Sequence, residues 1–282
     1  MGPIATALAI MGGLGLFFGA VLAVAYRFLR VPEDPRLEAV ENLLPATNCG
    51  ACGSPGCHAF AERLLAGDAA PSGCTVSAPS AVEAIAELLG VDAGAADKRV
   101  ARIHCAGDKG HAFQMAAYEG FESCRAASMV SAGGKACSWG CLGLADCQSA
   151  CTFGAITMSP EGLPVVDPAK CTACGDCIDA CPRDLITLVP VRQPLIVQCS
   201  APLTGEDARM ICRVACDACG RCVNDARPGL IQMRNGLPVI DYGDLGFTEP
   251  GPTLRCPTGA IQWVTAKQFT AEQEAKSHGR LG

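Results

Sequence analysis

The chain opens with its longest apolar run. Residues 4–26 carry no charged side chain, a stretch of about 23 residues, which is long enough to cross the hydrocarbon core of a bilayer as one helix. The pattern predicts a single transmembrane anchor over residues 1–30. A cleaved secretory signal is the alternative, because Ala23-Val24-Ala25 resembles a cleavage site, but no basic segment precedes the apolar run.

The next part of the chain has helical periodicity. Leu37, Val40 and Leu44 recur at helical spacing, and two more helical stretches follow before residues 91–98, which are rich in Ala, Gly and Asp. We expect a small helical domain over residues 31–91.

The remainder contains an internal repeat, which the cysteines reveal by a constant separation of 75 positions. The pairs are Cys124 and Cys199, Cys137 and Cys212, Cys141 and Cys216, Cys147 and Cys222, and Cys181 and Cys256. Residues 162–167 also match residues 236–241, one position out of phase. The sequence therefore predicts two copies of one cysteine-containing module.

Composition makes the cysteines the central feature. The chain has 282 residues, of which 20 are Cys, 32 Gly and 19 Pro, so it is rich in tight loops and in thiols. A net charge of −6 without a long basic run argues against nucleic acid as a partner. Hydrophobic residues make up 50% of the chain, which excludes a disordered or fibrous protein.

The charges flanking the apolar run predict where the cysteines lie. Arg27 and Arg30 follow the run and no basic residue precedes it, so the positive-inside rule places the rest of the chain in the cytoplasm, at the cell (inner) membrane. That compartment is reducing, which favours metal-binding thiolates over disulfides. Gly15 and Gly19 form a G-x-x-x-G step suited to packing against a partner helix.

The first repeat has the ligand pattern of a two-cluster ferredoxin. A C-x2-C-x2-C-x3-C-P run occupies residues 171–182, and a companion run with longer loops occupies residues 137–151. In such pairs, three thiolates of one run bind one [4Fe–4S] cluster and the fourth reaches the other cluster. The predicted sets are Cys137, Cys141, Cys147 and Cys181, and Cys151, Cys171, Cys174 and Cys177. Zinc is disfavoured, because it takes pairs of thiolates from separate knuckles.

The second repeat retains ligands for one cluster. Ala226 stands in place of Cys151, and cysteines are also absent at or beside Leu245, Thr248 and Gly251. The retained set is predicted to be Cys216, Cys219, Cys222 and Cys256. Repeat matching favours Cys212 over Cys219, whereas the tight C-x2-C-x2-C loop favours Cys219.

The N-terminal cysteines form a further four-ligand group, Cys49, Cys52, Cys57 and Cys74. Glycines between them allow the backbone to curl around a fourth [4Fe–4S] cluster, and a structural zinc ion is the alternative. Cys105, Cys124, Cys199 and one of Cys212 and Cys219 remain unassigned. They are either buried thiols or the ligands of an additional cluster.

These motifs, in this order, resemble the B subunits of the Rnf family of ion-translocating electron-transport complexes. The likeness includes the N-terminal anchor, the C-x2-C-x4-C-x16-C group, the segment 137–147 and the tandem ferredoxin units. It implies a membrane-anchored electron-transfer subunit of a translocase that couples electron flow between reduced ferredoxin and NAD to Na⁺ or H⁺ translocation. The implied partners are other membrane subunits and soluble ferredoxin.

The expected fold class is α+β. The expected domains are an anchor (1–30), a helical [4Fe–4S] module (31–91), a connecting segment (92–126), a two-cluster ferredoxin domain (127–190), a degenerate one-cluster ferredoxin domain (191–265) and a tail (266–282). No catalytic side chains are expected beyond the cluster ligands. The alternative function is a free-standing, membrane-tethered polyferredoxin that serves other reductases without pumping ions.

Overall fold

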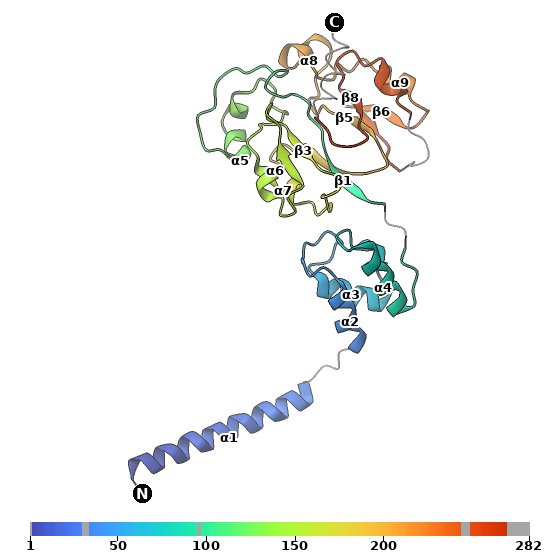
Figure 1. Ribbon diagram of the computed structural model, residues 1–282. Coiled ribbons are helices and arrows are strands. Elements are labelled where there is room, and N and C mark those ends of the chain that lie inside the picture. The colour runs from blue at the N-terminus through green and yellow to red at the C-terminus, as the bar shows by residue number, and fades with distance from the viewer. Residues whose placement is uncertain (1, 30–33, 95–96, 244–248, 270–282) are drawn as a thin grey trace.

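The computed structural model describes residues 2–29, 34–94, 97–243 and 249–269. A long helix, a small group of helices and a larger body of short strands and helices follow one another along the chain (Figure 1). Some residues used in the sequence argument lie outside the described part: Arg30, Leu245, Thr248 and most of the expected tail. The mixture of helices and strands is that of an α+β protein.

Helix α1 (Pro3–Leu29) is the predicted apolar helix. Its residues 7–29 have a mean hydropathy of 2.3, and none of that stretch is buried against the rest of the chain. Large apolar side chains such as Leu16 and Phe28 are 79% and 81% exposed. Length and composition suit a membrane span, and the bilayer would cover this apolar surface.

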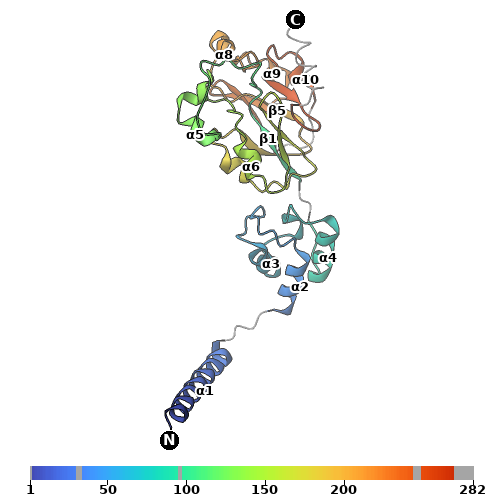
Figure 2. The same ribbon diagram turned by 60° about the vertical axis from the view of Figure 1, so that its left-hand side comes forward.

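The small group of helices consists of α2 (Pro35–Leu43), α3 (Cys57–Ala66), the 3₁₀ turn η1 (Pro71–Gly73) and α4 (Pro79–Leu89). Figure 2 shows α2, α3 and α4 gathered between α1 and the body. Their core contains Val40, Phe60 and Ile85, each almost completely buried. Gly67 and Gly90 adopt left-handed conformations that end α3 and α4.

The strands of the body form four antiparallel pairs. These are β1 (Arg99–Ile103) with β4 (Ile186–Pro190), β2 (Ile156–Met158) with β3 (Pro164–Val166), β5 (Leu195–Val197) with β8 (Ile261–Trp263), and β6 (Ile231–Arg234) with β7 (Leu237–Ile240). Short helices connect them: α5 (Cys124–Ser128), η2 (Ser131–Gly134), α6 (Asp146–Ala150), α7 (Asp176–Ala180), α8 (Gly205–Ile211), α9 (Arg221–Asp225) and α10 (Gly251–Leu254).

The same strand arrangement occurs twice. In each copy the first strand pairs with the last, β1 with β4 and β5 with β8, and a hairpin lies between them in sequence. Strand β1 lies within residues 92–126, which the sequence pattern assigns to a connecting segment, yet all its residues pair with β4. The strand has only five residues, two of them arginine, so local sequence gives no clear strand pattern. Only the long-range pairing identifies it as a strand.

The strand registers show which residues of the two copies correspond. Ile186 pairs with Ile103, and Ile261 pairs with Val197. One position further on, the N–H of His104 donates to Leu185 O and the N–H of Gln198 donates to Ala260 O, both at 2.7 Å. The following residues, Cys105 and Cys199, are therefore structural equivalents. The constant period of 75 matches Cys199 with Cys124 instead, because the first copy has a longer connection after β1.

The two copies contact each other through the ends of β1 and β5. The N–H of Ala106 donates to Gln198 O at 3.0 Å, and the hydroxyl of Ser200 donates to His104 O at 2.9 Å. A ring nitrogen of His104 also lies 2.7 Å from Val197 O. Cys105 and Cys199 thus lie at the junction between the copies.

Candidate metal centres

The cysteines gather into groups. All twenty are free thiols. Three separate cavities each have four thiols in their walls, and each encloses about 330 Å³, counting the part open to solvent. Four convergent thiols around a small cavity are the donor set of a metal–sulfur centre.

Three seven-residue loops with one backbone shape supply many of these thiols. They span residues 141–147, 171–177 and 216–222, and each begins and ends with Cys. Their third and fifth residues have positive φ in every case: Gly143 and Ala145, Ala173 and Gly175, and Ala218 and Gly220. These left-handed residues curl the loop so that its thiols face one side, and each loop runs directly into a short helix.

Two of the predicted ligand sets surround a cavity each. One cavity is lined by Cys151, Cys171, Cys174 and Cys177. Another is lined by Cys216, Cys219, Cys222 and Cys256. In each set three thiols come from one loop and the fourth from a distant segment, which is how ferredoxin loops hold a cubane. The structure places Cys219 at the second cavity, and Cys212 lies elsewhere.

The loop 141–147 lacks a middle thiol, because Leu144 occupies the position of Cys174 and Cys219 in the other loops. The thiol of Cys124 reaches this place, where it accepts hydrogen bonds from the backbone N–H groups of Asp146 and Leu144. Burial, and then the thiolates of Cys124 and Cys181, raise the pKa of Cys147 to about 12. Cys124 therefore belongs spatially with this loop, a position that its sequence spacing did not reveal.

The remaining cavity is lined by Cys105, Cys137, Cys199 and Cys212. Sequence spacing gives three of these residues no partners and groups Cys137 with the loop 141–147. Burial, and then the thiolates of Cys105, Cys199 and Cys137, raise the pKa of Cys212 to about 12. The sequence signals for this group are the unassigned cysteines, which number four, and the period of 75 that relates Cys137 to Cys212.

The N-terminal cysteines surround the core of the small helical domain. Cys74 is buried in that core, and Cys52 and Cys57 pack against it. Asn48 closes the loop, because its Oδ1 accepts a hydrogen bond from the N–H of Cys57 at 2.8 Å. Gly50 and Gly53 have positive φ, which lets the chain turn sharply between the thiols.

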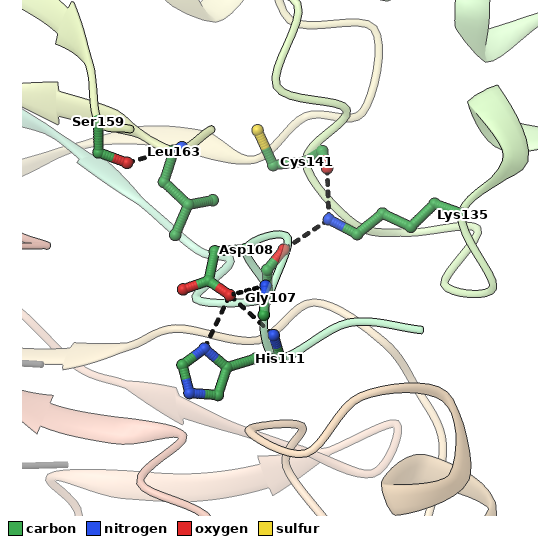
Figure 3. A network of polar contacts seen from close by, with 8 residues as sticks. Gly107, Asp108, His111, Lys135, Cys141, Ser159 and Leu163 are labelled. Atoms are coloured by element: carbon green, nitrogen blue, oxygen red, sulfur yellow. Dashed lines mark hydrogen bonds and ion pairs between the residues drawn. The ribbon is translucent and has the colours of Figure 1, made fainter. Parts of the chain in front are cut away.

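Lys135 is a buried cation among these thiols. It is 6% exposed, and its Nζ donates to the backbone oxygens of Gly107 and, at 2.6 Å, Cys141 (Figure 3). Among the described residues no carboxylate forms an ion pair with it. In the same view Asp108 accepts hydrogen bonds from the backbone and ring of His111, so the carboxylate labelled there has other partners.

The donor sets fit [4Fe–4S] clusters. Each of the cavities offers thiols, which are the ligands of iron–sulfur cubanes. Backbone N–H groups point at several of the sulfur atoms, for example Ala155 N at 3.4 Å from Cys151 Sγ. The described part of the chain contains no group of three or more His, Cys, Asp or Glu side chains placed to hold a single metal ion. A zinc ion needs such close convergence, with Zn–S distances of about 2.3 Å.

Burial raises the pKa of several of these thiols and so favours their protonated form at neutral pH. It is the largest cause that raises the pKa of Cys177 and Cys216 to about 12, with neighbouring thiolates adding to it. Metal binding at neutral pH must therefore release protons, as is general for thiolate ligands.

Two protein families match parts of the chain. The family described as "Putative Fe-S cluster" matches residues 44–76, and the family described as "4Fe-4S dicluster domain" matches residues 136–186. The first range contains the N-terminal cysteines. The second contains the loops 141–147 and 171–177 with Cys181.

Curated relatives match most of the chain. It is 44% identical, over 83% of its length and 70% of the relative's, to the B subunit of the Na(+)-translocating ferredoxin:NAD(+) oxidoreductase complex of Acetobacterium woodii. It is 36% identical to the B subunit of the ion-translocating oxidoreductase complex of Methanosarcina acetivorans, over 90% of this chain and 96% of that one. A proton-translocating counterpart from Clostridium ljungdahlii is also 36% identical, over 94% of both chains.

The grouped thiols, the apolar N-terminal helix and the similarity along nearly the whole length agree with one another. The chain belongs to the family of B subunits of ion-translocating oxidoreductase complexes, and it is an iron–sulfur electron-transfer subunit.

Proposed function

We propose that this subunit passes electrons, one at a time, between soluble ferredoxin and the NAD-linked subunits of a membrane complex that translocates Na⁺ or H⁺. The observation that carries the proposal is the gathering of thiols in fours around separate cavities. Relatives named as B subunits of ferredoxin:NAD(+) oxidoreductase complexes support the partners. One of these relatives is named for Na⁺ and the other for protons, which is why the proposal names both ions.

Bound [4Fe–4S] clusters supply one-electron transfer, and the protein holds, shields and tunes them. We assign clusters to Cys49, Cys52, Cys57 and Cys74, to Cys151, Cys171, Cys174 and Cys177, and to Cys216, Cys219, Cys222 and Cys256. A fourth uses Cys141, Cys147 and Cys181 with one further thiol. N–H groups directed at the sulfur atoms stabilise added negative charge and so favour the reduced state.

Three of the proposed centres are close to one another in space. The hydroxyl of Thr75, next to Cys74, donates to Thr172 O at 2.6 Å, next to Cys171. The pKa of Cys177 is raised by burial and, in part, by the thiolate of Cys147. Three centres are thus neighbours, as an electron route requires.

The proposed arrangement in the cell follows from α1. Arg27 is in its last turn and no charged residue lies in its first turn, which supports a cytoplasmic position for the cysteine-rich body. The body itself we interpret as tandem ferredoxin-like domains, because the strand arrangement and the cysteine loops recur together.

The test is electron uptake by the full chain, purified anaerobically in detergent. Reduced ferredoxin should bleach its visible absorbance and produce the electron paramagnetic resonance signals of reduced [4Fe–4S] clusters. Cys171→Ala should remove one cluster, and Val239→Ala, which changes an exposed side chain on β7, serves as control. A chain that holds zinc but no iron, or holds iron but takes no electrons from ferredoxin, would contradict the proposal.

A further inference from the structure

We infer that Cys105, Cys137, Cys199 and Cys212 hold a fifth [4Fe–4S] cluster at the junction between the two copies. The inference rests on the proposed function, because it takes the other thiol groups to be cluster sites. It also assigns Cys124, in place of Cys137, as the fourth ligand beside Cys141, Cys147 and Cys181. All twenty cysteines then belong to five sets of four.

The four thiols face one cavity. They line it together with Gly107, Gly140 and Lys135. A Cβ on Gly107 would lie 3.0 Å from Cys212 Sγ and 3.7 Å from Cys105 Sγ, and a Cβ on Gly140 would lie 3.4 Å from Cys137 Sγ. The glycines thus keep the space between the sulfur atoms open.

The set is symmetric with respect to the repeat. Cys105 corresponds to Cys199 by strand register, and Cys137 corresponds to Cys212 by the period of 75. Each copy therefore contributes the same two ligands.

The hydrogen bonds to these thiols are symmetric as well. The N–H of Cys141 donates to Cys105 Sγ at 3.3 Å, and the N–H of its counterpart Cys216 donates to the Cys199 thiol. N–H groups of the equivalent residues Trp139 and Val214 donate to the thiols of Cys137 and Cys212. The two copies thus present equivalent thiols with equivalent backbone donors to one cavity, as the ligands of a shared centre would be.

Leu144 explains why Cys137 is free for this role. The second copy fills its own centre with the middle thiol of the loop 216–222, Cys219. The first copy has Leu144 there, and the Cys124 thiol receives the N–H of Leu144. In each copy, the centre at the loop thus has four thiols without the cysteine that lies four positions before the loop. That cysteine is Cys137 in the first copy and Cys212 in the second.

Lys135 gives an independent reason to place negative charge in this cavity. A buried ammonium group is costly unless an anion compensates it. Nζ has two backbone oxygens as partners, and the described residues offer it no carboxylate. Four thiolates bound to a cubane carry net negative charge, so the cluster would supply the missing counter-charge.

The fifth site also connects the second copy to the rest. The contact of Cys141 N with Cys105 Sγ joins the fifth site to the centre at the loop 141–147. The contact of Cys216 N with Cys199 joins the fifth site to the centre of the second copy. Contacts between ligands thus lead from the first copy through this site to the centre of the second copy.

The experiment is an anaerobic count of iron, acid-labile sulfide and zinc in the full chain. Five cubanes predict about twenty irons with matching sulfide, whereas four predict about sixteen. Cys105→Ala and Cys199→Ala should each lose about four irons. Val239→Ala changes an exposed side chain on β7 that belongs to none of the three cavity walls, and it should lose none.

The outcomes separate the inference from the proposed function. About sixteen irons in the unmodified chain, or about sixteen with one zinc, would overturn the fifth cluster and leave the electron-transfer function intact. Absence of iron would overturn the function itself. The count on the unmodified chain decides the question even where a variant fails to fold.

Discussion

Leu144 shows how one residue changes which thiol completes a centre. The backbone of its loop matches the other two loops at both left-handed positions, so the loop shape does not depend on a middle cysteine. The thiol that lies at this place is instead that of Cys124, a residue on helix α5, and we propose it as the ligand. Spacing rules describe ligands within a run, and they miss a thiol that arrives from another segment.

This exchange predicts a rescue. Cys124→Ala should remove about four irons, and adding Leu144→Cys should restore them, because the second change recreates the middle thiol of a C-x2-C-x2-C loop. Leu142→Cys in the Cys124→Ala background is the matched control and should restore nothing. Iron content and the resonance spectrum of the reduced chain measure both results. Full iron content in Cys124→Ala alone would contradict this ligand assignment.

Gly56 predicts a defect confined to the N-terminal domain. A Cβ there would lie 2.9 Å from Asn48 Oδ1, the acceptor of the Cys57 N–H, so Gly56→Ala should break a hydrogen bond worth about 1 kcal/mol. We expect a chelator to remove about four irons faster than from the unmodified chain. Gly251→Ala, whose Cβ would meet Asp225 O at an ordinary 3.5 Å, is the control. Iron release at the same rate from Gly56→Ala and Gly251→Ala would contradict this prediction.

At the scale of elements, the pairing of β1 with β4 holds the first copy together. It joins residues 99–103 to residues 186–190 across the whole length of that copy. The side chain of Gln268 adds to this ribbon, since its amide group bonds both Ile103 N, at 2.9 Å, and Ile103 O, at 3.0 Å. A segment near the end of the chain therefore secures the first strand of the body.

Gln268→Leu should destabilise the body. The change keeps most of the side-chain volume but leaves the N–H and C=O of Ile103 without these partners, which costs about 1–3 kcal/mol per buried group. Urea unfolding of the iron-loaded chain, followed by circular dichroism, should show a lower midpoint. Gln232→Leu alters an exposed glutamine on β6 and should stay within about 0.5 kcal/mol. A midpoint unchanged by Gln268→Leu would show that these bonds do not support the ribbon.

At the scale of the whole molecule, the apolar surface of α1 is not covered by the rest of the described chain. Within the described chain nothing lies within 4 Å of a Cβ built on Gly15 or Gly19. Larger side chains there would not disturb the subunit itself. Any effect of such changes would report on contacts with other membrane helices.

The double change Gly15→Leu and Gly19→Leu should reduce co-purification with the membrane subunits, because small residues allow helices to approach closely. Iron content of the isolated chain should not change. Gly13→Leu, on a different face of the helix, is the control and should co-purify normally. Undiminished co-purification of the double variant would favour the alternative of a free-standing, membrane-tethered polyferredoxin.

The sequence alone determined the features that depend on neighbours along the chain. The apolar run 4–26 predicted α1, because a helix follows from local composition. The C-x2-C-x2-C spacings predicted that three thiols come together from one loop, and the cysteine period predicted a repeat that the strand arrangement shows. The resemblance that rested on these motifs is confirmed by the relatives.

Only the tertiary structure decided which distant thiols meet. Cys124 joins the loop 141–147, and Cys105 and Cys199 face each other across the junction, because strand pairing brings together segments that lie far apart in sequence. The pairing of β1 with β4 was likewise invisible to local patterns. A cluster needs four ligands that are close together in space. Sequence spacing predicts the ligands that come from one loop, but not the fourth ligand, which comes from a distant segment.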